Sequence, residues 1–275
     1  MKRLIFSSLV VVAAIIFSAA FTSCKDTDPN DGGKTDRLIA GKFASPNGGN
    51  AVFYADYVSA VGVKAASESE RELVGKIEDG DIVFNLKGIF NETTHMFFLS
   101  AGSSILIYQI VGTLTDGEIT NSEATIKVKL GNEWIIHTVS ITSAEDITIV
   151  GSVSNQQVEG IPQKWHGTWV EDVDGNLMIT SYQMILIDEP HRPMGFLDIV
   201  SLGDNKYEMV WESLQPMEDE FQIMYIKAWI EEIEQGLLVT HFYESMSDTY
   251  ALTAAFDTTT ADDPEMQGEF ILTRP

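Results

Sequence analysis

Cysteine is almost missing from this chain, which has 275 residues and a single thiol at Cys24. One cysteine cannot form an internal disulfide bond, and it cannot supply the several thiolates of a structural zinc site. Beyond Cys24 the chain also offers no cysteine nucleophile. The fold must therefore be stabilised by burial of apolar side chains, and a chain of this length is long enough to form a sizeable core.

Basic residues are also scarce. The chain has 17 lysines and arginines against 41 acidic residues, which gives a formal net charge of −24. There is no run of Lys or Arg that could reverse this field locally, and a negative surface repels phosphate backbones and anionic lipid headgroups. We therefore expect no nucleic-acid partner. The charge does not exclude cations as partners. The acidity is more typical of a soluble surface than of a binding site.

The common catalytic motifs are absent as well. The sequence contains no Gly-x-Ser-x-Gly elbow, no phosphate-binding Walker loop, no dinucleotide glycine fingerprint and no His-Glu-x-x-His helix. Its five histidines show no spacing typical of metal ligands: His95, His137, His166, His191 and His241. Adjacent acidic residues are expected by chance among 41 carboxylates, so they give no evidence for glycosidase chemistry. We predict no catalytic residue, no metal ion and no cofactor.

The first residues form a pattern typical of secretion. Lys2 and Arg3 precede an apolar run from Leu9 to Phe17, which continues through Ala19, Ala20 and Phe21, and this is the layout of a signal peptide. The run ends at Phe21-Thr22-Ser23-Cys24. This ending resembles a lipobox, with Phe21 in place of the usual leucine. The resemblance implies a signal peptide over 1–23, cleavage before Cys24 and a lipid on its thiol. An uncleaved transmembrane helix over Leu4 to Phe21 is the alternative, since that length is close to the minimum for a span.

A polar segment follows Cys24 and favours cleavage. Residues 25–34 contain no apolar side chain that could enter a core, so we interpret 24–37 as the lipidated cysteine and a flexible tether. Lys25-Asp26-Thr27-Asp28 resembles the surface-export signal of Bacteroidetes lipoproteins, with a solvated linker as the alternative. The resemblance implies a membrane partner reached through the lipid on Cys24. It also implies an outer-membrane, surface-exposed location in the cell envelope.

Beyond the tether the dominant pattern is alternation of apolar and polar residues. It is clearest in three stretches, Asp81 to Lys87, Thr125 to Leu130 and Lys206 to Glu212. Period two over four to eight residues is typical of half-buried strands in antiparallel sheets. Residues that tolerate positive φ lie between the stretches, for example Asp79-Gly80 and Asp116-Gly117. The sequence therefore predicts an all-β protein.

Two segments are less clear. Phe221 to Gln235 has apolar residues near helical spacing, but Ile223, Ile226 and Ile230 make both of its faces apolar. We favour a buried strand, with Gly236 to Tyr243 as the return limb of a hairpin. A short, highly charged helix is the expectation for Ser67 to Leu73.

A polar interruption divides the strand-rich sequence. Val153 to Gln163 is rich in Ser, Asn and Gln and contains Gly160 and Pro162, so we place a domain boundary there. The predicted domains are two antiparallel β-domains, 38–155 and 156–275. The first opens with the strand Gly41-Lys42-Phe43 and is a sandwich or a barrel. Its uncharged stretch Thr94 to Leu114 predicts a pair of central strands.

The second domain begins with a recognisable motif. Gly167-Thr168-Trp169 resembles the start of lipocalin-like (calycin-like) barrels, in which this tryptophan packs across the closed end. The resemblance implies an eight-stranded up-and-down barrel, and eight candidate strands can be counted. They lie around Trp169, Ile179 to Asp188, Met194 to Ser201, Lys206 to Ser213, Phe221 to Glu231, Gly236 to Glu244, Thr249 to Phe256 and Gln267 to Thr273.

Large aromatic side chains gather in the second domain. A barrel of eight strands can hold one small apolar molecule, so we select as candidate binding residues Trp169, Trp211, Tyr225, Trp229 and Phe242. Core packing by the same side chains is the alternative. The sequence favours a non-catalytic cell-envelope module that binds a small apolar molecule, a glycan or a partner protein. An envelope hydrolase with carboxylates at the domain interface, and a structural or adhesive surface protein, are the other hypotheses.

Overall fold

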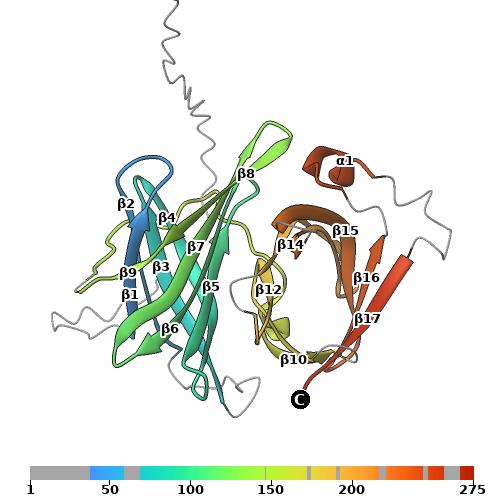
Figure 1. Ribbon diagram of the computed structural model, residues 1–275, viewed down its shortest axis with the longest axis horizontal. Helices are drawn as coiled ribbons and strands as arrows, with labels where there is room; N and C mark the ends of the chain where they lie inside the picture. Colours follow the sequence, from blue (N-terminus) through green and yellow to red (C-terminus); the bar gives the residue numbers. More distant parts are fainter. Residues whose placement is uncertain are drawn as a thin grey trace, which may run out of the picture. The chain divides into compact units, whose positions relative to one another are not determined.

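The computed structural model describes residues 38–58, 69–145, 147–171, 175–189, 193–216, 221–243, 247–256 and 267–275. Cys24, the expected signal peptide, the tether and His191 lie outside these residues. The described part is nearly all β and contains two antiparallel sheets with one short α-helix (Figure 1). Both sheets belong to one compact unit, Thr35–Pro275. The all-β prediction is therefore confirmed.

The first sheet has nine strands in the order β8-β7-β6-β5-β4-β3-β2-β1-β9. It nearly closes on itself, because β9 pairs with β1 while the backbone N–H of Ile119 on β7 donates to the Ser143 hydroxyl on β9. The strands are β1 Ile39–Ala44, β2 Asn50–Tyr57, β3 Glu70–Asp79, β4 Ile82–Asn91, β5 Met96–Gly102, β6 Leu106–Thr115, β7 Glu118–Leu130, β8 Glu133–Ser140 and β9 Thr142–Ser143.

Alternation determines which face of this sheet becomes its core. Phe84 and Leu86 on β4 point into one apolar cluster together with Phe53 and Ile126 from other strands. Inside it, the Tyr108 hydroxyl donates to Asp79 over 2.7 Å. Burial raises the pKa of that hydroxyl, followed by the effect of the Asp79 acceptor, so Tyr108 stays protonated and its polar end is satisfied within the core.

The second sheet is a closed barrel of eight antiparallel strands, as predicted. Each strand pairs with the next along the chain, and β10 pairs with β17 to close the ring. The strands are β10 Gly167–Glu171, β11 Gly175–Ile179, β12 Gln183–Leu186, β13 Met194–Gly203, β14 Lys206–Pro216, β15 Phe221–Glu234, β16 Leu237–Tyr243 and β17 Gln267–Thr273. A 3₁₀ turn, η1 Gln163–Trp165, precedes β10.

Two strand assignments within the barrel were wrong. Thr249 to Phe256 contains the helix α1 Tyr250–Ala254, whose buried residues Tyr250 and Thr253 are three apart, which is a helical and not a strand period. The predicted strand Ile179 to Asp188 is instead broken by a tight turn, where the N–H of Thr180 donates to the carbonyl of Gln183. The hairpin β11–β12 therefore supplies the strand that the helix does not.

Other local predictions have mixed outcomes. Phe221 to Glu234 is a strand, as favoured, and β5 and β6 lie in the middle of the first sheet. The helix expected at Ser67 to Leu73 was wrong where the structure describes it, because β3 begins at Glu70 and pairs along its length with β4. That pairing satisfies the backbone of the charged residues without a helix.

The outer face of the first sheet packs against the outer face of the barrel. One apolar cluster joins Ile89, Phe98 and Val111 of the sheet to Met178 and Ile185 of the barrel. A second cluster joins Ile107 and Trp134 to barrel residues and to α1; these are Tyr182, Leu197, Val210, Tyr225 and Tyr250. The sheet and the barrel are therefore held together by core-like packing within one unit.

A buried ion pair lies in the same interface. Lys127 on β7, 1% exposed, places its ammonium 3.0 Å from a carboxylate oxygen of Glu212 on β14. The ammonium lies over Gly195, where an added Cβ would come within 1.6 Å of it. Burial lowers the pKa of Lys127, while Glu212 acts in the opposite direction. Gln109 completes this centre by donating to the carbonyl of Tyr182 over 2.6 Å.

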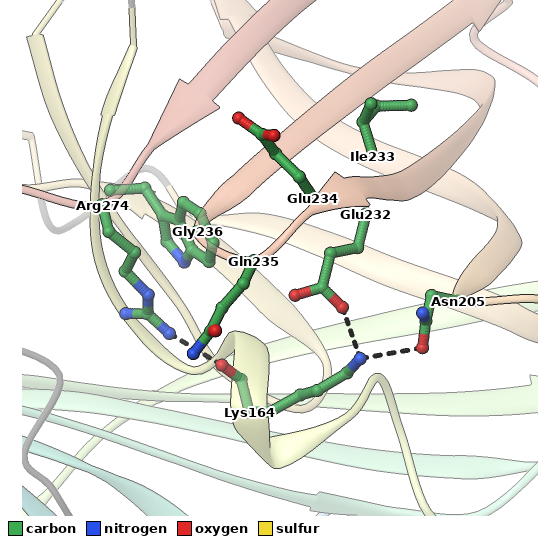
Figure 2. A pocket seen from close by; sticks show the side chains of 9 residues that line it. Lys164, Asn205, Glu232, Ile233, Glu234, Gln235, Gly236 and Arg274 are labelled. Atoms are coloured by element: carbon green, nitrogen blue, oxygen red, sulfur yellow. Dashed lines mark hydrogen bonds and ion pairs between the residues drawn. The ribbon is translucent and has the colours of Figure 1, made fainter.

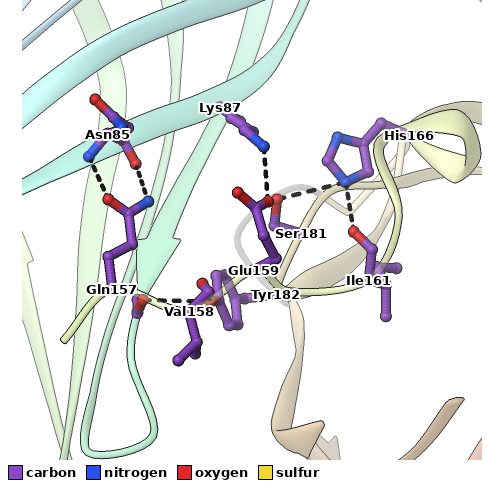
Figure 3. Close-up of polar contacts among 10 residues, drawn as sticks. Asn85, Lys87, Gln157, Val158, Glu159, Ile161, His166, Ser181 and Tyr182 are labelled. Carbon is purple, nitrogen blue, oxygen red and sulfur yellow. Dashed lines mark hydrogen bonds and ion pairs between the residues drawn. The ribbon is translucent and has the colours of Figure 1, made fainter. Parts of the chain in front are cut away.

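The segment between the last strand of the sheet and the barrel is fastened to both (Figure 3). The side-chain amide of Gln157 makes two hydrogen bonds to the backbone of Asn85, over 2.8 and 3.0 Å. Glu159 forms an ion pair with Lys87 over 2.7 Å. On the barrel side the N–H of Ile161 donates to the carbonyl of Ser181. The polar residues that suggested a domain boundary thus form hydrogen bonds and an ion pair that connect the sheet to the barrel.

Candidate functional site

The inward face of the barrel is the candidate site, and its side chains form one apolar cluster. Alternation along each strand places every second residue inside. The buried members of the cluster are Ile161, Trp165, Trp169, Leu177, Ile179, Met184, Phe196, Met209, Trp211, Ala228, Ile230, Leu238 and Leu272. These residues come from all eight strands and from the segment before β10, so the cluster is the shared interior of the ring.

Solvent exposure along this interior changes from one end to the other. At the end where η1 and the β15–β16 turn lie, inward residues such as Ile230, Leu238 and Leu272 are fully buried. On β15 and β16, the inward residues toward the opposite end, where β14 joins β15, are half-buried; they are Met224, Ile226 and Phe242. The other half-buried residues packed against the cluster are Leu186, Met194, Ile199, Tyr207 and Phe270, of which Tyr207 lies at the first end, 5.3 Å from the Trp165 ring. The first end is thus closed by packing, while apolar side chains at the second end, called the mouth below, remain accessible to solvent.

Besides the indole nitrogen of Trp165 at the first end, two polar atoms deeper in this interior have no hydrogen-bond partner among the residues that the structure describes. They are the indole nitrogen of Trp211 and the hydroxyl of Thr240, on side chains that are 3% and 0% exposed. A buried polar group without a partner costs about 1–3 kcal/mol. Such a cost is commonly relieved by an internal water or a ligand atom.

Three of the five predicted binding residues meet inside the barrel. Trp169 and Trp211 are buried in the interior cluster, and Phe242 packs against it. The ring of Trp211 lies 6.0 Å from that of Phe196 and 5.6 Å from that of Phe270. Sequence reasoning did not select Phe196, Phe270 or Thr240. The alternation that it used elsewhere would have found Thr240, because this residue lies between Leu238 and Phe242 on the same face of β16.

The other two predicted residues lie outside the barrel interior. Tyr225 packs between the sheet and the barrel, with its ring 5.7 Å from that of Tyr250. Trp229 is on the outer face, where the His241 ring stacks on it at 4.6 Å and the Lys206 ammonium lies 4.7 Å from its ring centre. Both alternate with inward residues of β15 and therefore cannot line the interior.

Trp169 and Arg274 close one end of the barrel. The Arg274 guanidinium lies 4.2 Å from the centre of the Trp169 ring, and the indole N–H of Trp169 donates to the carbonyl of Trp165 over 2.7 Å. Arg274 also donates to the carbonyls of Lys164 and His166, each over 2.8 Å. The arginine thus ties the C-terminal end of β17 to the turn before β10, which seals the ring.

A polar pocket of about 510 Å³ lies outside this closed end (Figure 2). The Lys164 ammonium contacts both the Glu232 carboxylate and the Asn205 side chain. Burial alone would raise the pKa of Glu232, but the Lys164 ammonium, the Trp165 indole and the charge of Arg274 together outweigh it and hold that pKa below its ordinary value. Glu232 is therefore a paired, ionised carboxylate and is poorly suited to act as a general acid.

Among the described residues, no three His, Cys, Asp or Glu side chains are arranged to hold a metal ion. The buried carboxylate between sheet and barrel, Glu212, faces Lys127. No helix within the described ranges has the length and apolar character needed to cross a membrane. Comparisons with protein families, with characterised proteins and with solved structures found no match to this chain.

Proposed function

We propose that the barrel of this protein binds a small apolar molecule through its mouth, and that the protein is a non-catalytic binding module. The observation that carries the proposal is the exposure gradient of the interior. Half-buried Ile226 and Phe242 on the side of the mouth lead to the fully buried Ile230 and Leu238, and Trp211 and Thr240 leave polar atoms unpaired in between. A lining of apolar side chains with a few convergent polar groups is typical of a small-molecule site.

Binding can be measured with N-phenyl-1-naphthylamine, an uncharged apolar dye that fluoresces when it leaves water. The full chain would be held in lipid nanodiscs, with empty nanodiscs as the blank. We expect saturable energy transfer from tryptophan to the dye, because Trp211 lies inside the barrel and dye dissolved in the lipid is farther away. A signal that rises linearly with dye concentration would contradict the proposal.

A matched pair of substitutions localises the dye. Ile226 points inward near the mouth, whereas Ile271 points outward on β17, and both are half-buried. Ile226→Phe adds bulk to the interior and should weaken dye binding about tenfold. Ile271→Phe makes the same chemical change on the outer face of the barrel and should leave dye binding unchanged. Equal effects of the two substitutions would place the dye elsewhere.

For the location of the protein, we propose that lipid on Cys24 anchors it to the cell envelope, as its lipobox-like residues imply. Cys24→Ser should move the protein from the membrane fraction to the soluble fraction after cell lysis. The melting temperature should not change, since Cys24 precedes the compact unit Thr35–Pro275. Retention of Cys24→Ser in the membrane fraction would instead support an uncleaved apolar segment.

A further inference from the structure

The unpaired polar atoms restrict the chemistry of the ligand, an inference that rests on the function proposed above. An indole N–H is only a donor, and a threonine hydroxyl donates or accepts. The Trp211 indole and the Thr240 hydroxyl therefore both accommodate a ligand oxygen. Neither atom is satisfied by the residues that the structure describes.

One side chain, Phe270, adjoins both Trp211 and Thr240. Thr240 is the register partner of Phe270 on β17, and the Phe270 ring is 5.6 Å from the ring of Trp211. A ligand end group that reaches Phe270 thus lies beside both polar side chains. The apolar remainder of the ligand would extend past Ile226 and Phe242 toward the mouth.

Charge in the interior points to an uncharged ligand. Among the described inward residues between Trp169 and the mouth there is no lysine or arginine, and the charged residue there is Glu171, which is in register with Leu272. Arg274 lies against Trp169 and is occupied by backbone carbonyls. A ligand carboxylate would lose its hydration without gaining a counter-charge, in a chain whose formal net charge is −24.

We propose that the barrel selects uncharged apolar molecules that carry one hydroxyl or carbonyl oxygen, and that it holds this oxygen against Trp211 and Thr240. The barrel selects against carboxylates because the described inward residues offer no lysine or arginine to pair with them. Fatty alcohols and ketones have this chemistry, whereas ionised fatty acids do not.

The test compares three ligands of equal chain length, 1-dodecanol, dodecane and dodecanoate, as competitors of N-phenyl-1-naphthylamine at pH 8. The full chain in nanodiscs is used, and each variant is compared with the wild type for the same ligand, so that partition into lipid cancels. Trp211→Phe and Thr240→Val should each weaken the binding of 1-dodecanol about three- to tenfold. Neither substitution should change the binding of dodecane. After correction for the partition of each ligand into the lipid, measured with empty nanodiscs, dodecanoate should compete more weakly than 1-dodecanol for the wild type.

Two controls separate ligand contact from folding. Thr253→Val removes a buried hydroxyl that donates to the carbonyl of Tyr225 outside the interior, and it should not change ligand preference. Thr240→Val should leave the melting temperature of the ligand-free protein equal or higher, because it removes an unpaired buried group. Unchanged 1-dodecanol binding in both interior variants, or dodecanoate that competes as well as 1-dodecanol, would overturn the inference while dye binding stands. Failure of the dye itself to bind would overturn the proposed function.

Discussion

Replacing Lys127 by alanine is expected to lower the free energy of unfolding by about 3–5 kcal/mol, because it leaves the Glu212 carboxylate buried without a counter-charge. Both side chains lie in the interface between sheet and barrel, and their charged groups are 3.0 Å apart. A small side chain at 127 also leaves a cavity over Gly195. Urea denaturation at pH 7 followed by circular dichroism measures the change.

The double variant Lys127→Met with Glu212→Leu is the matched control. It removes both charges and retains most of the side-chain volume, so we expect it to recover most of the lost free energy. Lys206→Ala serves as a surface control, since Lys206 and Glu231 are 3.9 Å apart and about a third exposed. That variant should lose less than about 1 kcal/mol. A Lys127→Ala variant as stable as Lys206→Ala would show that the interface opens to solvent.

Lys127 also shows what the sequence could not predict. Alternation correctly places Ile126 in the core of the first sheet and Lys127 on the opposite face. The same pattern suggests that this opposite face meets solvent, whereas the barrel covers it. A local pattern of period two identifies the two faces of a strand, but not what packs against the polar face. Glu212, which shared the predicted polar face of β14, is buried for the same reason.

For the candidate site as well, the sequence predicted some inward residues but misplaced others. The motif Gly167-Thr168-Trp169 and the alternation from Tyr207 to Trp211 were enough to predict a barrel and two of its inward tryptophans. On β15 both faces are apolar, because one faces the interior and the other packs against α1 and neighbouring side chains. Composition alone therefore could not assign Tyr225 and Trp229 to the outer face. Their assignment requires the register with β14.

Helix α1 lies where the sequence predicted a strand. A strand over Thr249 to Phe256 completes the count of eight, and its residues are compatible with a strand. The helix forms because its Tyr250 ring packs against Trp134 and Tyr225, contacts that come from distant parts of the chain. Tertiary packing can override a weak local preference over so few residues.

Acid is expected to destabilise the protein through His166. This side chain is 7% exposed, and its Nε2 lies 3.2 Å from the carbonyl oxygen of Ile161 (Figure 3). Burial lowers the pKa of His166 to about 4. In the unfolded chain the imidazole takes up a proton near its ordinary pKa of about 6.5, while the native state does not. The stabilising contribution is therefore complete above about pH 6.5 and is lost as the pH falls toward 4.

The expected loss over this range is roughly 3 kcal/mol, since each pKa unit corresponds to about 1.4 kcal/mol. His166→Gln removes the titrating group, so its free energy of unfolding should fall less than that of the wild type between pH 7 and pH 4.5. Carboxylates titrate in both proteins, and the difference between them isolates His166. His241→Gln provides the comparison on the outer face, where burial also lowers the pKa of His241 but the ring is only half-buried. The difference between His241→Gln and the wild type in the loss of unfolding free energy between pH 7 and pH 4.5 should be smaller. Parallel curves for wild type and His166→Gln would mean that the native state binds this proton as readily as the unfolded chain, which a ring enclosed between Ile161 and Ser181 should not do.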